Sequence, residues 1–148
     1  MFFDKLNATG RLNIKLYDKN HIIKKEIDVP NLVVTVGKEY ITDRMTSNAT
    51  SVMSHMAVGI DNTNLASANT TLESEVAGSR TALTSSTVTG NSVEYVATFS
   101  EGVGTGALVE AGIFNSGTNG IMLCRTTFGV VNKEATDTLT INWTVTVN

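Results

Sequence analysis

Residues 138–147 read TLTINWTVTV and alternate strictly between apolar and polar side chains. The apolar set is Leu139, Ile141, Trp143, Val145 and Val147, and the polar set is Thr138, Thr140, Asn142, Thr144 and Thr146. Because successive side chains of a β-strand point to opposite faces, this stretch predicts a strand with a core on one side and water or a polar partner on the other. Such a strand belongs in a sheet whose apolar face is covered by a second layer.

Two further stretches predict β-hairpins. In residues 11–29, apolar and polar positions alternate on both sides of a polar turn at Asp18–His21. In residues 81–100, the dipeptide Gly90-Asn91 separates two alternating runs and suits a two-residue turn. With that turn, the predicted cross-strand pairs are Val88 with Val93, Ser86 with Tyr95, Thr84 with Ala97, and Ala82 with Phe99.

One short helix and one further strand are predicted between the hairpins. Apolar residues recur at helical spacing over residues 37–46, and Thr35 stands where a capping residue belongs. Residues 52–60 alternate larger apolar residues with smaller ones, which predicts a buried strand after the helix.

Residues 61–79 have no clear period of either kind, apart from one helical turn predicted around Leu72–Val76. We therefore expect a long ordered loop in this part of the chain. Loops of this length in compact domains are usually functional or contact a partner.

The composition agrees with a β-rich fold. Thr, Ser, Asn, Gly and Val are abundant and Pro30 is the only proline, which favours strands joined by polar turns. At 148 residues, with no linker and no repeat, the chain is expected to form a single domain over residues 1–148. The predicted fold class is all-β: an antiparallel β-sandwich, jelly-roll-like, with the one short helix near residues 37–46.

Residues 107–128, ALVEAGIFNSGTNGIMLCRTTF, place one charge in each of two apolar runs, Glu110 and Arg125. A hairpin with a loop over Asn115–Gly120 and Phe114 facing Ile121 would set Glu110 directly opposite Arg125. Opposite charges facing each other across two strands stabilise a sheet by roughly 0.2–1 kcal/mol on an exposed face.

Both faces of this predicted hairpin are mostly apolar, which implies that something besides the domain's own core covers one of them. In one interpretation Glu110 and Arg125 lie at a subunit contact, where the pair fixes the register. In the other they form a surface pair beside a wide core. The pattern does not decide between the two.

Residues that could carry chemistry are few. His55, Asp61 and a serine are the only triad that we can propose, and a lone strand histidine such as His55 is usually structural. Cys124 is the only cysteine and is expected to be a buried thiol. No metal-ligand spacing is present, and the Gly-rich residues 101–106 lack the lysine of a phosphate loop. We therefore predict no catalytic, cofactor or metal site.

Charge and hydropathy argue against two classes of partner. The net charge is −3 at pH 7 and no basic stripe is present, so nucleic acid is not expected to bind. No run approaches the ~20 apolar residues of a membrane span, and the N-terminus lacks the apolar region of a secretory signal. We expect a soluble protein that is made in a cytoplasm.

The first nine residues, 1–9, are expected to form an N-terminal arm. They contain Phe2 and Phe3, which are exposed unless they dock on another surface. Such an arm would anchor the chain to a neighbouring subunit. The alternative is a short strand that pairs at the edge of a sheet.

A series of fragments in residues 56–147 resembles a class of small virion structural proteins of tailed bacteriophages. The fragments are MAVGIDNTNLASANTTLESEV, VEYVATF, GTGALVEAGIFN, GIMLCRTTF and DTLTINWTVTV, in that order. They are similar to a pattern of M-A-hydrophobic-G, L-x-x-E, E-A-G-hydrophobic-F-N and a final W-T-hydrophobic-T strand. The upstream NLVVTVGKEYI is similar to the segment before that pattern, whereas Cys124 and Asp61-Asn62 depart from the small or Gly-rich residues expected there.

The resemblance implies a β-rich, non-enzymatic component of the virion, often a homotrimer, assembled in the cytoplasm of the host bacterium. A short chain without a coiled coil or fibre repeat suits a capsid decoration or cement protein that binds the major capsid protein. The alternative is a tail, neck or head-fibre/collar component for attachment, in which residues 61–79 contact a partner or a glycan. An enzyme is the contrasting third class. The residues expected at contacts with other subunits are Phe2, Phe3, Glu110, Phe114 and Arg125.

Overall fold

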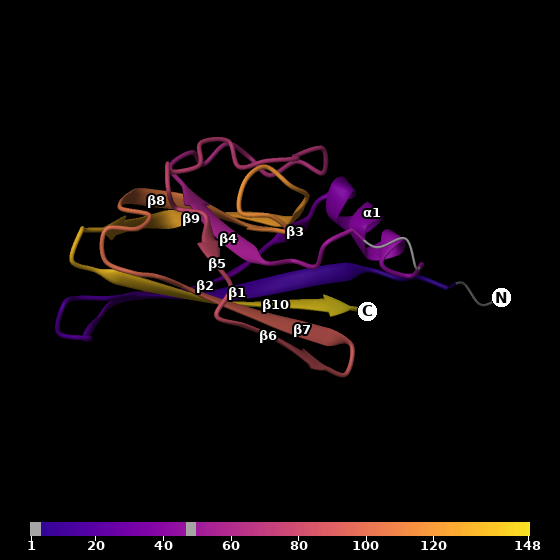
Figure 1. The fold of residues 1–148 in the computed structure, drawn as a ribbon, viewed down its shortest axis with the longest axis horizontal. Coiled ribbons are helices and arrows are strands. Elements are labelled where there is room, and N and C mark those ends of the chain that lie inside the picture. Colours follow the sequence, from indigo (N-terminus) through magenta and orange to yellow (C-terminus); the bar gives the residue numbers. More distant parts are fainter. Residues whose placement is uncertain (1–3, 47–49) are drawn as a thin grey trace.

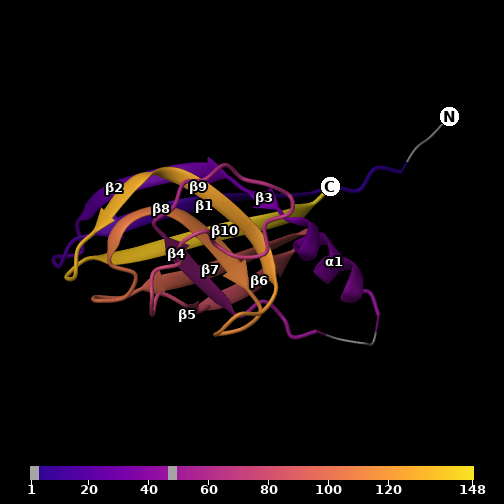
Figure 2. The same ribbon diagram turned by 90° about the horizontal axis from the view of Figure 1, so that it is seen from above.

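The computed structural model describes residues 4–46 and 50–148, which form two five-stranded antiparallel sheets packed face to face (Figures 1 and 2). In chain order the elements are β1 (Ala8–Tyr17), β2 (Ile23–Pro30), β3 (Leu32–Val33), α1 (Thr35–Asp43), β4 (His55–Gly59), β5 (Thr81–Ala82), β6 (Ser85–Thr89), β7 (Ser92–Phe99), β8 (Gly106–Phe114), β9 (Met122–Lys133) and β10 (Thr138–Val147). The first sheet has the order β2-β1-β10-β7-β6, and the second has the order β3-β9-β8-β4-β5. The predicted all-β sandwich with one short helix is confirmed.

The apolar face of β10 lies against the core, as its alternation predicts. Ile141 and Trp143 are fully buried, and the intervening Thr and Asn side chains lie on the outer face. β10 is central in its sheet, because Ile141 pairs with Ile14 of β1 on one side and with Ala97 of β7 on the other. The pairing of β1 with β2 confirms the predicted hairpin in residues 11–29.

The second sheet is covered on both faces. β8 is buried without interruption from Leu108 to Phe114, so it has no solvent-facing side over that length. Its inner face joins the main core, while a smaller apolar cluster of Ala57, Leu72, Phe114 and Met122 lies on its outer face. Figure 1 shows the segment between β4 and β5 running over this outer face.

The helix begins two residues earlier than predicted and ends at Asp43 instead of residue 46. Thr35 is its first helical residue and makes no capping bond; Val34 occupies the cap position, without a side-chain hydrogen bond. The buried Val34 and the bond from the Thr35 N–H to the Ser67 carbonyl, 2.8 Å, set this start. Gly37 lets α1 approach β9 closely, since a Cβ atom there would lie 2.2 Å from the Leu123 carbonyl oxygen.

The hairpin around Gly90 has the predicted register near its turn, with Val88 opposite Val93 and Ser86 opposite Tyr95. The prediction is wrong further from the turn. Ala82 pairs with His55 in the second sheet, and the Thr84 N–H bonds to the Val96 carbonyl. The physical reason is that the chain crosses from one sheet to the other between β5 and β6, so the hairpin cannot continue.

The predicted strand in residues 52–60 is shorter in the structure, where β4 spans His55–Gly59 and both Val52 and Ile60 are exposed. The predicted helical turn around Leu72–Val76 is absent from that segment, which is held by an isolated bridge between Gly59 and Glu75. Cys124 is fully buried, as expected.

Phe2 and Phe3 of the predicted arm lie outside the described residues. Ala8 and Thr9 belong to β1 and pair with Val147 and Thr146 of β10, whereas β2 pairs with β1 only from Arg11 onward. At these two residues the strand therefore lies at an edge of the sheet, as the alternative expected. Asn7 continues the ladder by exchanging two backbone hydrogen bonds with Asn148, of 3.0 and 2.7 Å. Among residues 4–46 and 50–148, no helix has the length and apolar character needed to cross a membrane.

Candidate functional site

Glu110 and Arg125 form an ion pair in the structure, but not across the strands as predicted. Glu110 lies opposite Thr127, and Arg125 lies opposite Gly112, because the β8–β9 ladder has irregularities next to Glu110 and Phe114. The pair is therefore diagonal, with Arg125 Nε 3.1 Å from Glu110 Oε1. Both side chains are 0% exposed, so the interpretation as a surface pair is wrong.

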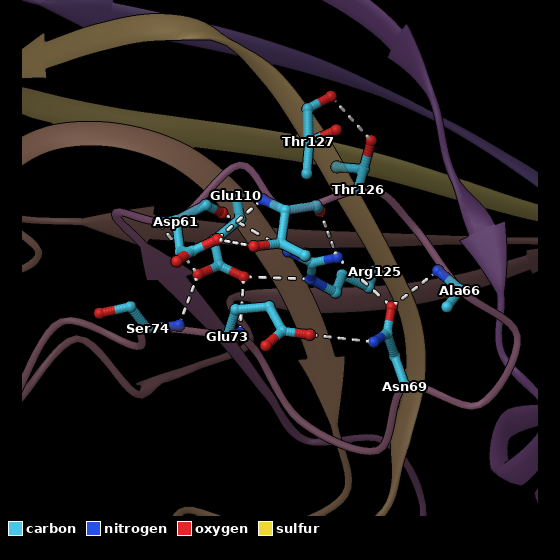
Figure 3. A network of polar contacts seen from close by, with 10 residues as sticks. Asp61, Ala66, Asn69, Glu73, Ser74, Glu110, Arg125, Thr126 and Thr127 are labelled. Carbon is cyan, nitrogen blue, oxygen red and sulfur yellow. Dashed lines mark hydrogen bonds and ion pairs between the residues drawn. The ribbon is translucent and has the colours of Figure 1, made fainter.

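The cover over this pair is the chain's own segment 61–76. The Glu110 carboxylate accepts hydrogen bonds from the backbone N–H groups of Glu73 (2.9 Å), Ser74 (2.8 Å) and Asp61 (3.3 Å), in addition to the bond from Arg125 (Figure 3). A buried carboxylate with four donors is well compensated for its loss of water. Glu110 therefore closes both ends of the loop onto β8.

Arg125 binds the middle of the same loop. Its Nη1 donates to the carbonyl oxygen of Thr63 (3.1 Å) and to Asn69 Oδ1 (3.3 Å), and its Nη2 donates to the Asp61 carbonyl (3.5 Å). Asn69 links Arg125 to two further residues of the loop. Its Oδ1 accepts from the Ala66 N–H (2.9 Å) and its Nδ2 donates to Glu73 Oε1 (3.1 Å) (Figure 3). We call residues 61–76 the clamped loop.

Two glycines allow the clamped loop to lie close to the sheet. A Cβ atom at Gly59 would stand 2.5 Å from both Glu110 Oε2 and the Ser74 carbonyl oxygen. A Cβ atom at Gly112 would stand 3.0 Å from Leu72 Cδ2. Neither position has room for a side chain without moving the loop.

Phe114 and Arg80 form a second attachment beside the first. The Arg80 guanidinium carbon lies 3.7 Å from the centroid of the Phe114 ring, a cation–π contact. Arg80 Nη1 donates to the carbonyl oxygens of Ser116 and Asn119, both at 2.9 Å, and Nη2 pairs with Glu75 at 2.8 Å. Arg80 therefore joins the clamped loop to the β8–β9 turn, and Phe114, 1% exposed, lies beneath it.

The outward side of residues 62–71 is uncharged, whereas Glu73 and Glu75 near the end of the clamped loop are exposed. Residues 62–71 read NTNLASANTT and contain only small polar side chains, alanines and one leucine. Asn62, Asn64, Ser67 and Thr70 are exposed, as are Ala66 and Ala68. The result is an irregular surface segment whose backbone is fixed from below by buried charges.

The structure does not assemble the triad considered above. His55 is the first residue of β4 and its Nδ1 lies 2.7 Å from Ser54 Oγ, whereas Asp61 follows the other end of that strand. Asp61 accepts from the Thr63 hydroxyl and N–H, and these bonds, with the charge of Arg125, hold the pKa of its carboxyl below 3.8. No cluster of three potential metal ligands exists in the described part of the chain.

Of the predicted contact residues, the structure brings together Glu110, Arg125 and Phe114, all buried under the chain's own loop. Sequence reasoning missed Asn69 and Arg80. Asn69 lies in a segment without a period, and nothing in the pattern around Arg80 marks it.

Comparisons of the chain with protein-family models, with curated proteins and with solved structures find no match.

Proposed function

We propose that this protein is a non-enzymatic structural component of a tailed-phage particle, and specifically a decoration or cement protein that binds and stabilises the assembled head. One observation carries the proposal: three fragments of the resemblance coincide with residues that build the clamped loop. MAVG supplies Gly59, the L-x-x-E segment supplies Leu72 and Glu75, and EAGIFN supplies Glu110 and Gly112. Three fragments of the resemblance therefore meet at one place in the fold, while VEYVATF and DTLTINWTVTV form β7 and β10 of the first sheet.

The physical properties of the clamped loop support a role in binding another protein. A loop that is already ordered loses little conformational entropy on association, so more of the contact energy appears as affinity. Residues 62–71 of the loop can be buried without leaving an unpaired charge, because none of them is charged. A cement protein acts through added buried area between subunits, and this ordered, uncharged stretch offers such area.

The main partner in this proposal is the major capsid protein, and copies of the chain itself associate as a homotrimer. The two apolar faces of the hairpin at residues 107–128, together with the resemblance, predict the trimer. The clamped loop accounts for that second face within one chain, so support for self-association now comes from the resemblance and from the surface described in the next section.

One observation favours the alternative of a tail, neck or head-fibre/collar component. An open cavity of about 530 Å³ lies between the clamped loop and the β8–β9 turn, and its wall combines Leu72 with the polar side chains of Thr71, Glu75, Arg80, Thr118 and Asn119. Hydroxyl, amide and charged groups around one hollow are the groups that recognise a sugar. In this alternative the cavity binds a host glycan.

The experiment that tests the proposal is quantitative mass spectrometry of purified particles of the phage that encodes the chain. Copies comparable in number with the major capsid protein support a decoration protein. A small fraction of that number supports the tail, neck or fibre alternative. Absence of the chain from the particles would overturn both.

A binding assay adds a matched test of the surface. Purified protein is sedimented with assembled heads, and Ala66→Arg in the clamped loop is compared with Thr98→Arg on the outer face of β7. Loss of co-sedimentation for Ala66→Arg alone supports contact through the clamped loop. Equal binding of both variants would show that the loop does not take part in the contact with the head.

A further inference from the structure

An apolar groove opens beneath α1 at the end of the sandwich. Two cavities of about 200 and 250 Å³ lie there and share Ile41 and Val147 in their walls, so they form one continuous depression. We define the α1 groove by Ile41 of the helix, Leu123 of β9, and Val93, Tyr95, Val145 and Val147 of the first sheet. Figure 1 shows this end, where α1 stands over β10 and the β6–β7 hairpin.

The groove is apolar because the first sheet extends beyond the second at this end. Val93 pairs with Val145 on the inner face of the sheet, where a residue would normally meet the opposite layer. Among the described residues, α1 and Leu123 of β9 border these side chains, and Val93, Tyr95 and Val147 stay partly accessible. Val88, next to Val93 on the edge strand, is 72% exposed. Apolar surface in such a depression marks a site that another chain segment can fill.

The chain's own N-terminal segment passes the mouth of the groove without filling it. Leu6 borders the first cavity but is 76% exposed. Asn7 pairs with Asn148 through two backbone hydrogen bonds, so β1 continues straight past the end of β10. Figure 2 shows residues 4–7 running away from the sandwich and from α1. To enter its own groove, this segment would have to reverse direction within a few residues.

We propose that the α1 groove receives the N-terminal segment, residues 1–6, of a second copy of this chain. The segment reads MFFDKL and carries the apolar side chains Phe2, Phe3 and Leu6, which match an apolar depression. An extended segment of six residues reaches up to ~20 Å, which is far enough to cross from one copy to the next. Exchange of the same segment around a closed ring gives each copy one donated arm and one filled groove.

This inference rests on the proposed function in that it names the contact through which copies of the particle component associate. It does not involve the major capsid protein. The self-contact and the binding to particles can therefore fail separately.

Cysteine cross-linking between two different variants tests the contact directly. One variant carries Phe3→Cys and the other carries Val93→Cys, and the two are mixed under mild oxidation. Cys124 does not compete, because it is fully buried and burial raises the pKa of its thiol. A docked segment holds its thiol at an effective concentration of ~1 mM beside the second thiol. We therefore expect about tenfold more mixed disulfide dimer than for the control pair. The control is Phe3→Cys mixed with Ile60→Cys, an exposed position beyond β4.

Two results would overturn the proposal. A double variant with both cysteines that closes a disulfide within one chain, with no mixed dimer above the control, would place the arm in its own groove. No disulfide above the control in either experiment would show that the groove does not receive the arm.

A second variant needs no new disulfide. Phe2→Ser with Phe3→Ser leaves every residue of the described sheets unchanged, so circular dichroism should stay unchanged while light scattering shows a loss of oligomer. An unchanged oligomer would reject the arm as the contact but leave the proposed self-association standing. A wild-type monomer at micromolar concentration would reject both the contact and the trimer, while particle copy number would still test the virion role.

Discussion

Gly59 lies against the carboxylate of Glu110, so close that a Cβ atom at this position would stand 2.5 Å from Oε2. The same hypothetical atom would also meet the Ser74 carbonyl oxygen at 2.5 Å. A single glycine therefore determines whether the clamped loop can reach the charges that hold it.

Replacing Gly59 with alanine should destabilise the fold. The methyl group has to displace either the buried carboxylate or the backbone of the loop, and overpacking of this kind costs about 1–3 kcal/mol. Chemical denaturation measures the free energy of unfolding. Gly129→Ala is the matched control, because no atom lies within 4 Å of a Cβ atom at that position. Equal stability of the two variants would contradict the close contact.

Removing either member of the Glu110–Arg125 pair should cost more than removing a surface charge. Each change leaves the other charge buried without its partner, a loss of about 3–5 kcal/mol. We expect Glu110→Gln and Arg125→Met to be strongly destabilising and Arg11→Ala, an exposed change, to be close to neutral. The double variant should lose clearly less than the sum of the singles, since a double-mutant cycle isolates the coupling between contacting residues. Strict additivity would show that the pair is not coupled.

We expect Arg125→Ala to weaken association with partners more than Glu110→Gln does. The reason is that Arg125, and not Glu110, holds Thr63 and Asn69 of the clamped loop. Light scattering and co-sedimentation measure this order. Equal and negligible effects on assembly would confine the pair to a role in stability.

Asp137 should contribute to acid unfolding. Burial opposes its charge, but the bonds from Lys24 Nζ (2.8 Å) and the Glu134 N–H (2.9 Å) outweigh it, so its pKa is lowered from 3.8. A carboxyl with a lower pKa in the folded state stabilises the fold above its unfolded pKa, and this contribution is lost as pH falls through the folded pKa. Asp137→Asn should therefore be less stable at pH 7 and lose less stability between pH 4 and 2. Parallel curves for variant and wild type would contradict this assignment.

Tyr95 should make the fold less stable as the pH rises into the alkaline range. Burial, with smaller contributions from Tyr40 and Cys124, raises its pKa from 10.0 to about 12. The unfolded chain then loses the phenol proton first, so stability falls as pH rises from 10 towards 12. Tyr95→Phe should flatten this part of the curve. Occupation of the α1 groove by a second chain would bury Tyr95 further and raise its pKa. Dilution separates the copies, so it should lower the pKa of Tyr95. The absorbance of tyrosinate measures this titration.

Strand positions were predictable where the alternation of side chains is itself the physical signal. β10 and β1 follow directly from period-two patterns, because each of these two strands has one buried and one outer face. β2 carries a weaker pattern, in which only Ile27 and Val29 are half-buried. The register of β8 against β9 was not predictable in the same way. Its two irregularities leave no mark in residues that are apolar on both faces, so a regular hairpin placed Glu110 opposite Arg125, two residues from its actual partner Thr127.

The candidate site was predictable only in part. Two charges in apolar strands indicated a special environment, and the absence of a period in residues 61–79 indicated an ordered loop. The loop covers the two charges through long-range hydrogen bonds to Glu110 from the backbone N–H groups of Asp61, Glu73 and Ser74, which every residue type except proline carries. Backbone contacts of this kind do not appear in a side-chain pattern.

The position of β10 has a consequence for the order of events during synthesis. Both β1 and β7 pair with this strand, so the β1–β2 and β6–β7 hairpins cannot join into one sheet until it is present. The chain must therefore be synthesised through β10 before the first sheet closes, because the partner of β1 lies more than 120 residues away in the sequence. Such distant pairing is slow to form. The unpaired edges of β1 and β7 stay open meanwhile, which makes the interval before β10 docks the period in which newly made chains are most exposed to pairing with one another.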